Sequence, residues 1–272
     1  MRAGFYIAIL GLIISTNCVH AKEYWFDNVD FSQVTSQVVN YKKDAAILRG
    51  NAVILETGKD LFTAYYDTGN MNLRYVNTGK LKFHGTPWDG KHGGNSIVAG
   101  NVFLSSGTSL AWAYNGSWAD PRKRDFAPLE RNYVKFKGTF RDDKNVVFHY
   151  TVGDSAVPVY EMPQMASKDV FLRHFTIPDV KEELQLKVFE NNKVKIGKDL
   201  FIKNSQFTLE SNDDGIYFLR IPKGSQQVNF SIRYSKSKSE LVLDEEDLLK
   251  YTNGSSLRWA ETIEMKGEYN ES

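Results

Sequence analysis

The sequence predicts an all-β fold: a large antiparallel β-sandwich with long loops and one short helix near the C-terminus. Short runs of β-branched, aromatic and other apolar residues recur along the chain, separated by clusters of Gly, Asn and Asp. Runs of this kind between turn residues are typical of antiparallel strands. About fifteen such runs are more than one open sheet usually holds, so we expect two packed sheets.

The first 21 residues have the pattern of a secretory signal peptide. Arg2 precedes an apolar run over residues 4–14 that is too short to span a bilayer, and Ala21 ends a segment with compact residues at the cleavage positions. We therefore predict a secreted or periplasmic module over residues 22–272, without a transmembrane segment. The alternative is a lipoprotein acylated at Cys18, although Asn17 fits poorly at the position before it.

Charge and cysteine content exclude several partners and cofactors. Cleavage would remove one of the 34 basic residues and leave 33, which balance the 33 acidic residues. A balanced charge gives no reason to expect nucleic acid or an anionic membrane as partner. Cys18 is the only cysteine, so the mature chain would lack a residue for disulfides, thiolate catalysis or covalent haem attachment. We expect no cofactor.

The first part of the module is expected to start with an irregular lead-in segment, residues 22–50. Turns at Gly, Asn and Asp then separate short β-rich runs, which predict strands over residues 52–56, 61–66, 73–77 and 97–104. Two stretches without strand character, residues 80–94 and 105–131, interrupt this series. Both are therefore candidate loops.

Strands resume at residue 133. Residues 133–140 and 145–152 flank a turn at 141–144, which predicts a hairpin with a four-residue connection. Further strands are predicted over residues 157–162, 169–177, 184–190, 193–196, 201–202, 206–209, 216–221 and 228–234. Acidic residues begin the one predicted helix, residues 244–251, and Gly254 follows its end. Pro178 marks the place where the module would divide if it held two β-domains.

The loop over residues 80–94 is the first candidate site. It contains four glycines and two of the five histidines. His84, Asp89 and His92 are residue types that ligate a divalent metal. Histidines eight positions apart in a glycine-rich loop have no fixed geometry, however, and such side chains commonly bond turn amides instead. We therefore predict no metal and include His84, Trp88, Asp89 and His92 among the ligand-binding candidates.

The second loop adds aromatic side chains. Trp112, Tyr114 and Trp118 would form, with Trp88, a platform for a sugar ring, because Trp and Tyr combine a large flat area with a polar tip. The alternative is that these rings close the open end of the core, because aromatic side chains are more often buried than exposed. Both interpretations stay open, and Trp118 is retained as a binding candidate.

Asp120 and Arg122 complete the set of candidate residues. Asp120-Pro121-Arg122 is typical of a turn in which the carboxylate caps backbone amides and Arg122 pairs with a neighbouring acid. The chain has no Gly-x-Ser-x-Gly, no glycine-rich phosphate loop before a helix and no His-Glu-x-x-His. These absences remove several classes of enzyme but not enzymes in general.

Several runs of the chain together resemble one family. They are residues 64–68, 73–75, 85–93, 118–122, 126–133, 137–138, 147–154 and 161–163. This pattern is similar to the uncharacterised N-terminal β-module of large secreted bacterial proteins, in which a six-bladed propeller like that of sugar dehydrogenases and a haem c domain follow. The resemblance extends over roughly residues 24–265 and departs at residues 77–80, where the family pattern tends to have Trp-Thr-Gly-Gly. It implies a secreted or periplasmic setting and an association with sugar oxidation or polysaccharide use, and it assigns no catalytic residue.

The resulting hypothesis is a β-sandwich module that binds a carbohydrate or a partner protein through the loops around Trp88 and Trp118. A second hypothesis is an enzyme that acts on a glycan with loop carboxylates or histidines. A third is a structural domain that docks to a separate propeller or cytochrome c protein. Turnover of a polysaccharide would favour the second, and capture of a propeller–cytochrome protein would favour the third.

Overall fold

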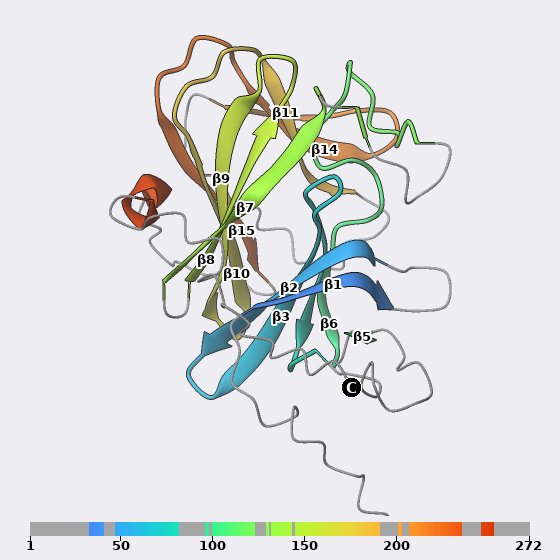
Figure 1. The fold of residues 1–272 in the computed structure, drawn as a ribbon, viewed down its shortest axis with the longest axis vertical. Coiled ribbons are helices and arrows are strands. Elements are labelled where there is room, and N and C mark those ends of the chain that lie inside the picture. Colours follow the sequence, from blue (N-terminus) through green and yellow to red (C-terminus); the bar gives the residue numbers. More distant parts are fainter. Residues whose placement is uncertain are drawn as a thin grey trace, which may run out of the picture. The chain divides into compact units, whose positions relative to one another are not determined.

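Figure 1 shows the chain as a computed structural model, which describes residues 33–40, 47–81, 96–97, 100–122, 129–130, 132–142, 145–190, 201–202, 207–235 and 246–252. All of these residues fall in one compact unit, Phe31–Ser272. The predicted signal peptide lies outside them, and so does the predicted strand over residues 193–196. No helix in the described ranges is long and apolar enough to cross a membrane.

The first sheet has six strands in the order β5-β1-β2-β3-β4-β6. Its strands are β1 (Gln33–Asn40), β2 (Ile47–Thr57), β3 (Asp60–Asp67), β4 (Asn72–Thr78), β5 (Ser96–Ile97) and β6 (Val102–Ser105). All neighbours pair antiparallel except β1 and β5, which are parallel. The prediction of an irregular lead-in segment up to residue 50 is wrong, because β1 and the first residues of β2 form a hydrogen-bonded pair there.

The second and third sheets are antiparallel. The second has the order β12-β15-β10-β9-β8-β7 and the third has the order β11-β14-β13. Their strands are β7 (Val134–Asp142), β8 (Asn145–Val152), β9 (Val157–Ser167), β10 (Val170–Ile177), β11 (Leu184–Glu190), β12 (Phe201–Ile202), β13 (Thr208–Ser211), β14 (Ile216–Ile221) and β15 (Val228–Ser235). Four of these, β8, β11, β12 and β14, have the predicted bounds.

The two six-stranded sheets pack face to face around one hydrophobic cluster, so the predicted all-β sandwich is confirmed. Tyr66 of β3 lies against Phe148 of β8 with ring centroids 4.6 Å apart. Leu186 and Leu219 of the third sheet belong to the same cluster. Strands on both sides of Pro178 thus share one sheet and one core, because β10 pairs with β15 along its whole length.

A buried ion pair lies between the two large sheets. Glu161 of β9 and Arg173 of β10 are at most 2% exposed, and the Arg173 Nε donates to the Glu161 Oε1 over 2.8 Å. The hydroxyls of Tyr66 and Tyr150 donate to the two carboxylate oxygens, each over 2.9 Å. Burial raises the pKa of both tyrosines well above its usual value, and the charge of Glu161 raises it further. Every oxygen of this carboxylate is therefore hydrogen-bonded in the core.

Strand β9 is longer than predicted because it continues through Pro163. The predicted strand ends at Met162, and a proline lacks the N–H that a central strand needs. The pairing of β9 with β8 ends at the Phe148–Glu161 pair. Pro163 lies beyond that point and faces Arg173 of β10 on the other side. The missing donor therefore interrupts no bond between β8 and β9.

The predicted strand over residues 97–104 is wrong, because it is divided between β5 and β6. Gly100 has a φ of 71°, a left-handed conformation that L-residues with a side chain rarely adopt. A Cβ at this position would lie 1.7 Å from the Thr78 carbonyl oxygen. The chain thus passes close to β4 at Gly100 and forms a bend there, which only glycine permits.

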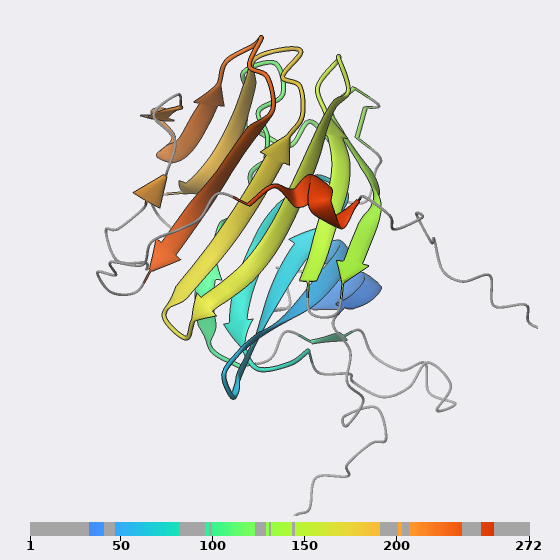
Figure 2. The same ribbon diagram turned by 90° about the vertical axis from the view of Figure 1, so that its left-hand side faces the viewer.

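Two smaller elements also differ from the prediction. The hairpin connection is shorter than four residues, because Asp142 of β7 faces Asn145 of β8 in the ladder. The helix is a single 3-10 turn, η2 (Leu248–Tyr251), capped by Asp247, whose side chain accepts from the Leu249 N–H. Figure 2 shows this turn lying across the second sheet, where Leu248 packs on apolar side chains of β7, β8 and β9.

Candidate ligand-binding site

Four of the seven predicted site residues lie outside the described ranges. They are His84, Trp88, Asp89 and His92 of the loop over residues 80–94. Their roles stay predictions. The remaining three candidates, Trp118, Asp120 and Arg122, are described and lie in one segment, which follows the first group of residues that line the hollow analysed below, 112–116.

Trp118 and Trp112 are core residues. Trp118 is 5% exposed and packs on Phe218 of β14 with ring centroids 5.3 Å apart. Trp112 is completely buried and contacts Tyr150 edge to face. Neither indole has a free face for a sugar ring, so these two side chains agree with the alternative in which aromatic residues close the end of the core. Tyr114 differs, because it is only half-buried.

Asp120 and Arg122 form the predicted turn. The Asp120 Oδ1 accepts from the Arg122 backbone N–H over 3.0 Å, and the Arg122 Nη2 lies 2.5 Å from the Asp120 Oδ2. Burial alone would raise the pKa of Asp120, but the bonds from Arg122 outweigh it and lower that pKa. The acid that pairs with Arg122 is therefore Asp120 itself. Both groups are engaged with each other, which favours a structural role.

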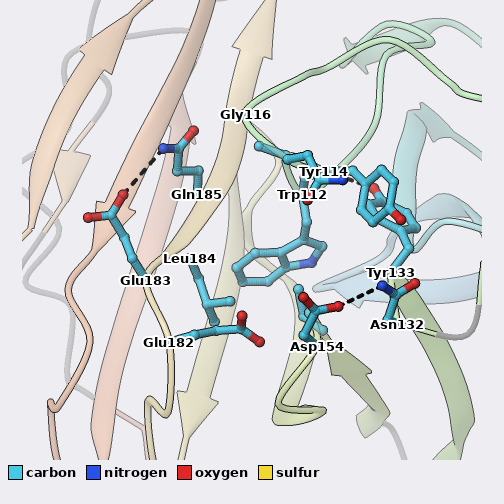
Figure 3. Close-up of a pocket in the computed structure, with 14 residues that line it drawn as sticks. Trp112, Tyr114, Gly116, Asn132, Tyr133, Asp154, Glu182, Glu183, Leu184 and Gln185 are labelled. Atoms are coloured by element: carbon cyan, nitrogen blue, oxygen red, sulfur yellow. Dashed lines mark hydrogen bonds between the residues drawn. The ribbon is translucent and has the colours of Figure 1, made fainter.

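A hollow of about 260 Å³ is lined in part by residues 112–116, which shortly precede this segment in the chain, and it is a candidate site. Three walls line it, as Figure 3 shows. They are a hairpin before Trp118, the end of the β7–β8 pair where β7 begins and β8 ends, and the start of β11. The lining residues are Trp112, Ala113, Tyr114, Asn115, Gly116, Asn132, Tyr133, Val152, Gly153, Asp154, Glu182, Glu183, Leu184 and Gln185. Most of the side chains labelled at its rim are polar.

The hairpin over residues 110–118 forms the first wall. Tyr114 and Ser117 exchange two backbone hydrogen bonds of 2.9 Å, and Asn115 and Gly116 between them have φ values of 50° and 73°. Two central residues with positive φ define the tight turn that Asn-Gly favours in β-hairpins. The hairpin is attached to β11 through bonds of Ala113 N–H to the Gln185 carbonyl. This attachment brings Tyr114 to the rim.

The loop before this hairpin is fixed by a buried lysine. The Lys187 ammonium group on β11 donates to the Ser109 carbonyl over 2.8 Å, to the Ser109 Oγ over 2.9 Å and to the Glu190 Oε1 over 3.1 Å. Burial lowers the pKa of Lys187 to about 8, against the opposing effect of Glu190. Because all three donors are used, this cluster positions the hairpin rather than offering a free amine.

One side-chain hydrogen bond holds the second wall together, and another joins the turn after β8 to the third wall. The Asn132 amide donates to the Asp154 Oδ1 over 2.6 Å, and the Glu182 Oε1 accepts from the Ser155 N–H over 2.8 Å. Gly153, with a φ of 76°, makes room for the second contact, because a Cβ there would lie 2.2 Å from the Glu182 Oε1. Glycine is therefore required at the turn between β8 and β9.

The rim of the hollow is acidic. The Tyr114 hydroxyl donates to Glu130, and this bond, partial burial and the charges of Glu130 and Asp154 raise the pKa of Tyr114. Glu183 is ion-paired with Arg220 and also accepts from Gln185. From the described residues, Asp154 and Glu182 receive the two neutral donors named above. The hollow thus presents hydrogen-bond acceptors in excess of donors.

Within the described part of the chain, no three His, Cys, Asp or Glu side chains are arranged to hold a metal ion.

Tyr133, at the start of β7, lines the hollow and contacts the hairpin wall. Its hydroxyl donates to the Trp112 carbonyl over 2.8 Å, and burial raises its pKa, with smaller effects from Asp120 and Arg122. The Tyr133–Trp112 bond therefore joins the start of β7 to the hairpin wall.

One family of known sequences matches this part of the chain. Residues 64–158 match a domain of unknown function, DUF6797. The DUF6797 stretch contains the hairpin and the β8–β9 turn that line the hollow, whereas Glu182 to Gln185 follow it. No curated protein and no solved structure matches the chain.

Sequence reasoning named Tyr114 but not the other rim residues. The Asn115-Gly116 pair is the strongest short signal for a hairpin and would have located the first wall. Asn132 and Asp154 both lie in runs that carry the family resemblance, so they were visible without a role. Glu182 lies in no such run, and nothing local distinguishes it from other surface acids.

Proposed function

We propose that the protein is an exported β-sandwich module that binds a short carbohydrate in the hollow beside Tyr114. The observation that carries this proposal is the hollow itself, with its polar rim and one accessible aromatic ring. Pockets for drug-sized ligands have volumes of about 300–1,000 Å³. A volume of about 260 Å³ suits one sugar ring or a short polyol.

The chemistry of the rim supports a polyhydroxylated ligand. Carboxylates and amides can each accept or exchange two hydrogen bonds with neighbouring hydroxyls. Asp154, Glu182 and Gln185 supply such groups from two walls, while Asn132 fixes the orientation of Asp154. The Tyr114 ring adds a face for the apolar side of a sugar. Trp112 and Trp118 contribute by supporting the walls from the core.

The setting that we propose follows from the signal-like N-terminus and from the resemblance to modules that precede sugar-dehydrogenase-like propellers. The protein would bind glycan fragments in a sugar-oxidation or polysaccharide-utilisation system outside the cytoplasm. Docking to a separate propeller or cytochrome c protein is the alternative supported by the same resemblance. The two are separable because a protein partner would not need the hollow.

Ligand-observed NMR with the full-length mature protein tests the proposal. We expect saturation transfer to monosaccharides and disaccharides from wild type, and loss of this signal in Tyr114→Ala and Asp154→Ala. Tyr251→Ala and Asp247→Ala are matched controls in and around η2, because Tyr251, like Tyr114, bonds a glutamate and Asp247, like Asp154, is exposed. Binding that survives both rim variants, or no binding to any sugar in a broad panel, would overturn the proposal. Release of products from a polysaccharide would instead identify an enzyme.

A further inference from the structure

We infer that the hollow selects a positively charged sugar, one with a free amino group, over neutral and acidic sugars. This inference rests on the proposed function and specifies the ligand class. The hollow defines the site, and the carboxylates around it decide which charge the ligand carries. The acids concerned are Asp154, Glu182 and Glu183, which line the hollow, and Glu130, which bonds the lining residue Tyr114.

Only one of these four acids has a cationic partner within the described residues. Arg220 pairs with Glu183 and with Glu210. Glu130, Asp154 and Glu182 accept from a phenol, an amide and a backbone N–H, respectively. A neutral donor leaves the negative charge of a carboxylate in place. Within the described ranges, three carboxylates without a cationic partner thus come from three different segments. Asp154 and Glu182 line the hollow, and Glu130 bonds Tyr114 at its rim.

This arrangement of charges should favour cationic ligands and disfavour anionic ones. An ammonium group has three donors and no acceptor, so it matches a rim in which acceptors predominate. Hydrogen bonds between charged partners are roughly twice as strong as those between neutral groups. A uronic acid would bring a further negative charge beside Asp154 and Glu182. The electrostatics therefore favour an amino sugar and disfavour an acidic one.

The negative charges of Asp154 and Glu182 can be removed without removing the hydrogen bonds that these side chains accept. Asp154→Asn keeps an oxygen that accepts from Asn132, and Glu182→Gln keeps an oxygen that accepts from Ser155 N–H. Each variant thus removes one charge and keeps its wall contact. Asp169→Asn is the matched control, because Asp169 lies in the turn after β9, at the end of that strand remote from Asp154.

The experiment compares glucosamine with N-acetylglucosamine, which share a ring and differ in charge, and with glucuronate. Titrations of the full-length mature protein by calorimetry or NMR should show glucosamine binding about five- to tenfold more tightly than N-acetylglucosamine. This preference should fall about threefold or more in Asp154→Asn and in Glu182→Gln but not in Asp169→Asn. It should also disappear in 1 M NaCl, where the screening length is about 3 Å.

The outcomes separate this inference from the proposed function. Equal affinity for glucosamine and N-acetylglucosamine, or tighter binding of glucuronate, would overturn the inference and leave carbohydrate binding in place. A preference that both charge variants retain would also overturn it. Failure of every sugar to bind would overturn the proposed function and the inference together. Thermal melts of each variant confirm that the fold is retained in the comparison.

Discussion

Replacing Glu161 by glutamine should destabilise the protein strongly, although it changes the side chain very little in size. The variant keeps one acceptor oxygen and loses the charge, so Arg173 remains buried without a counterion and one of the two tyrosine hydroxyls loses its acceptor. Breaking a buried ion pair in this way costs about 3–5 kcal/mol. A domain of this size has a total stability of about 5–15 kcal/mol, so the variant should fold but with a much reduced margin.

Equilibrium unfolding in urea measures this change, and Glu210→Gln provides the matched control. Glu210 also accepts two hydrogen bonds from an arginine, Arg220, but the pair is partly exposed at the third sheet. Such pairs contribute about 0–1 kcal/mol. A cost for Glu161→Gln within 1 kcal/mol of the cost for Glu210→Gln would refute the reasoning. The double variant Glu161→Met with Arg173→Met should recover part of the loss, because both buried charges are then absent.

Two further outcomes are expected. Four tyrosines have raised pKa values because they are buried, so they stay protonated in the folded state above pH 10 while the unfolded chain ionises; they are Tyr66, Tyr133, Tyr150 and Tyr234. The free energy of unfolding should therefore be independent of these tyrosines below about pH 10 and should fall above it by about 5 kcal/mol per pH unit. Urea titrations between pH 9 and 12 measure this fall. A flat profile would contradict the prediction. Gly153→Ala should lower the free energy of unfolding by about 1–2 kcal/mol because of the positive φ, and by a further amount because it disrupts the Glu182–Ser155 contact. Gly58 also has a positive φ, but a Cβ there would have nothing within 4 Å. Gly58→Ala should therefore lose only the part due to the backbone. Equal costs for the two glycine variants in thermal melts would show that Glu182 does not hold the turn.

The sequence allowed most strands to be predicted because they alternate in hydrophobicity and end at strong turn residues. β8, β11 and β14 have both properties, and their predicted bounds match. β1 was missed because Gln, Ser and Thr interrupt its valines, and its strand conformation depends on pairing with β2 and β5. The failure at Gly100 has a similar cause, since the approach of Thr78 that requires glycine there is a tertiary contact.

The buried ion pair could not be found from local pattern. Glu161 and Arg173 lie on neighbouring strands, and an alternating strand pattern would assign charged residues to the solvent face. Their burial depends on Tyr66, which is 95 positions from Glu161 in the sequence and supplies its hydroxyl from the opposite sheet. Such residues are costly to bury unless every partner is present, so the network restricts which strands can face each other.

The hollow, too, could not be found from local sequence pattern. Its walls are held by contacts between positions 16 to 27 apart: Tyr114 with Glu130, Asn132 with Asp154, and Ser155 with Glu182. No short motif contains both members of any of these pairs, so composition and spacing could indicate the hairpin but not the site. Among the described residues, Glu130, Asp154 and Glu182 each accept from a neutral donor of another segment. These bonds fix the positions of the three acids, and they depend on the fold that brings distant segments together.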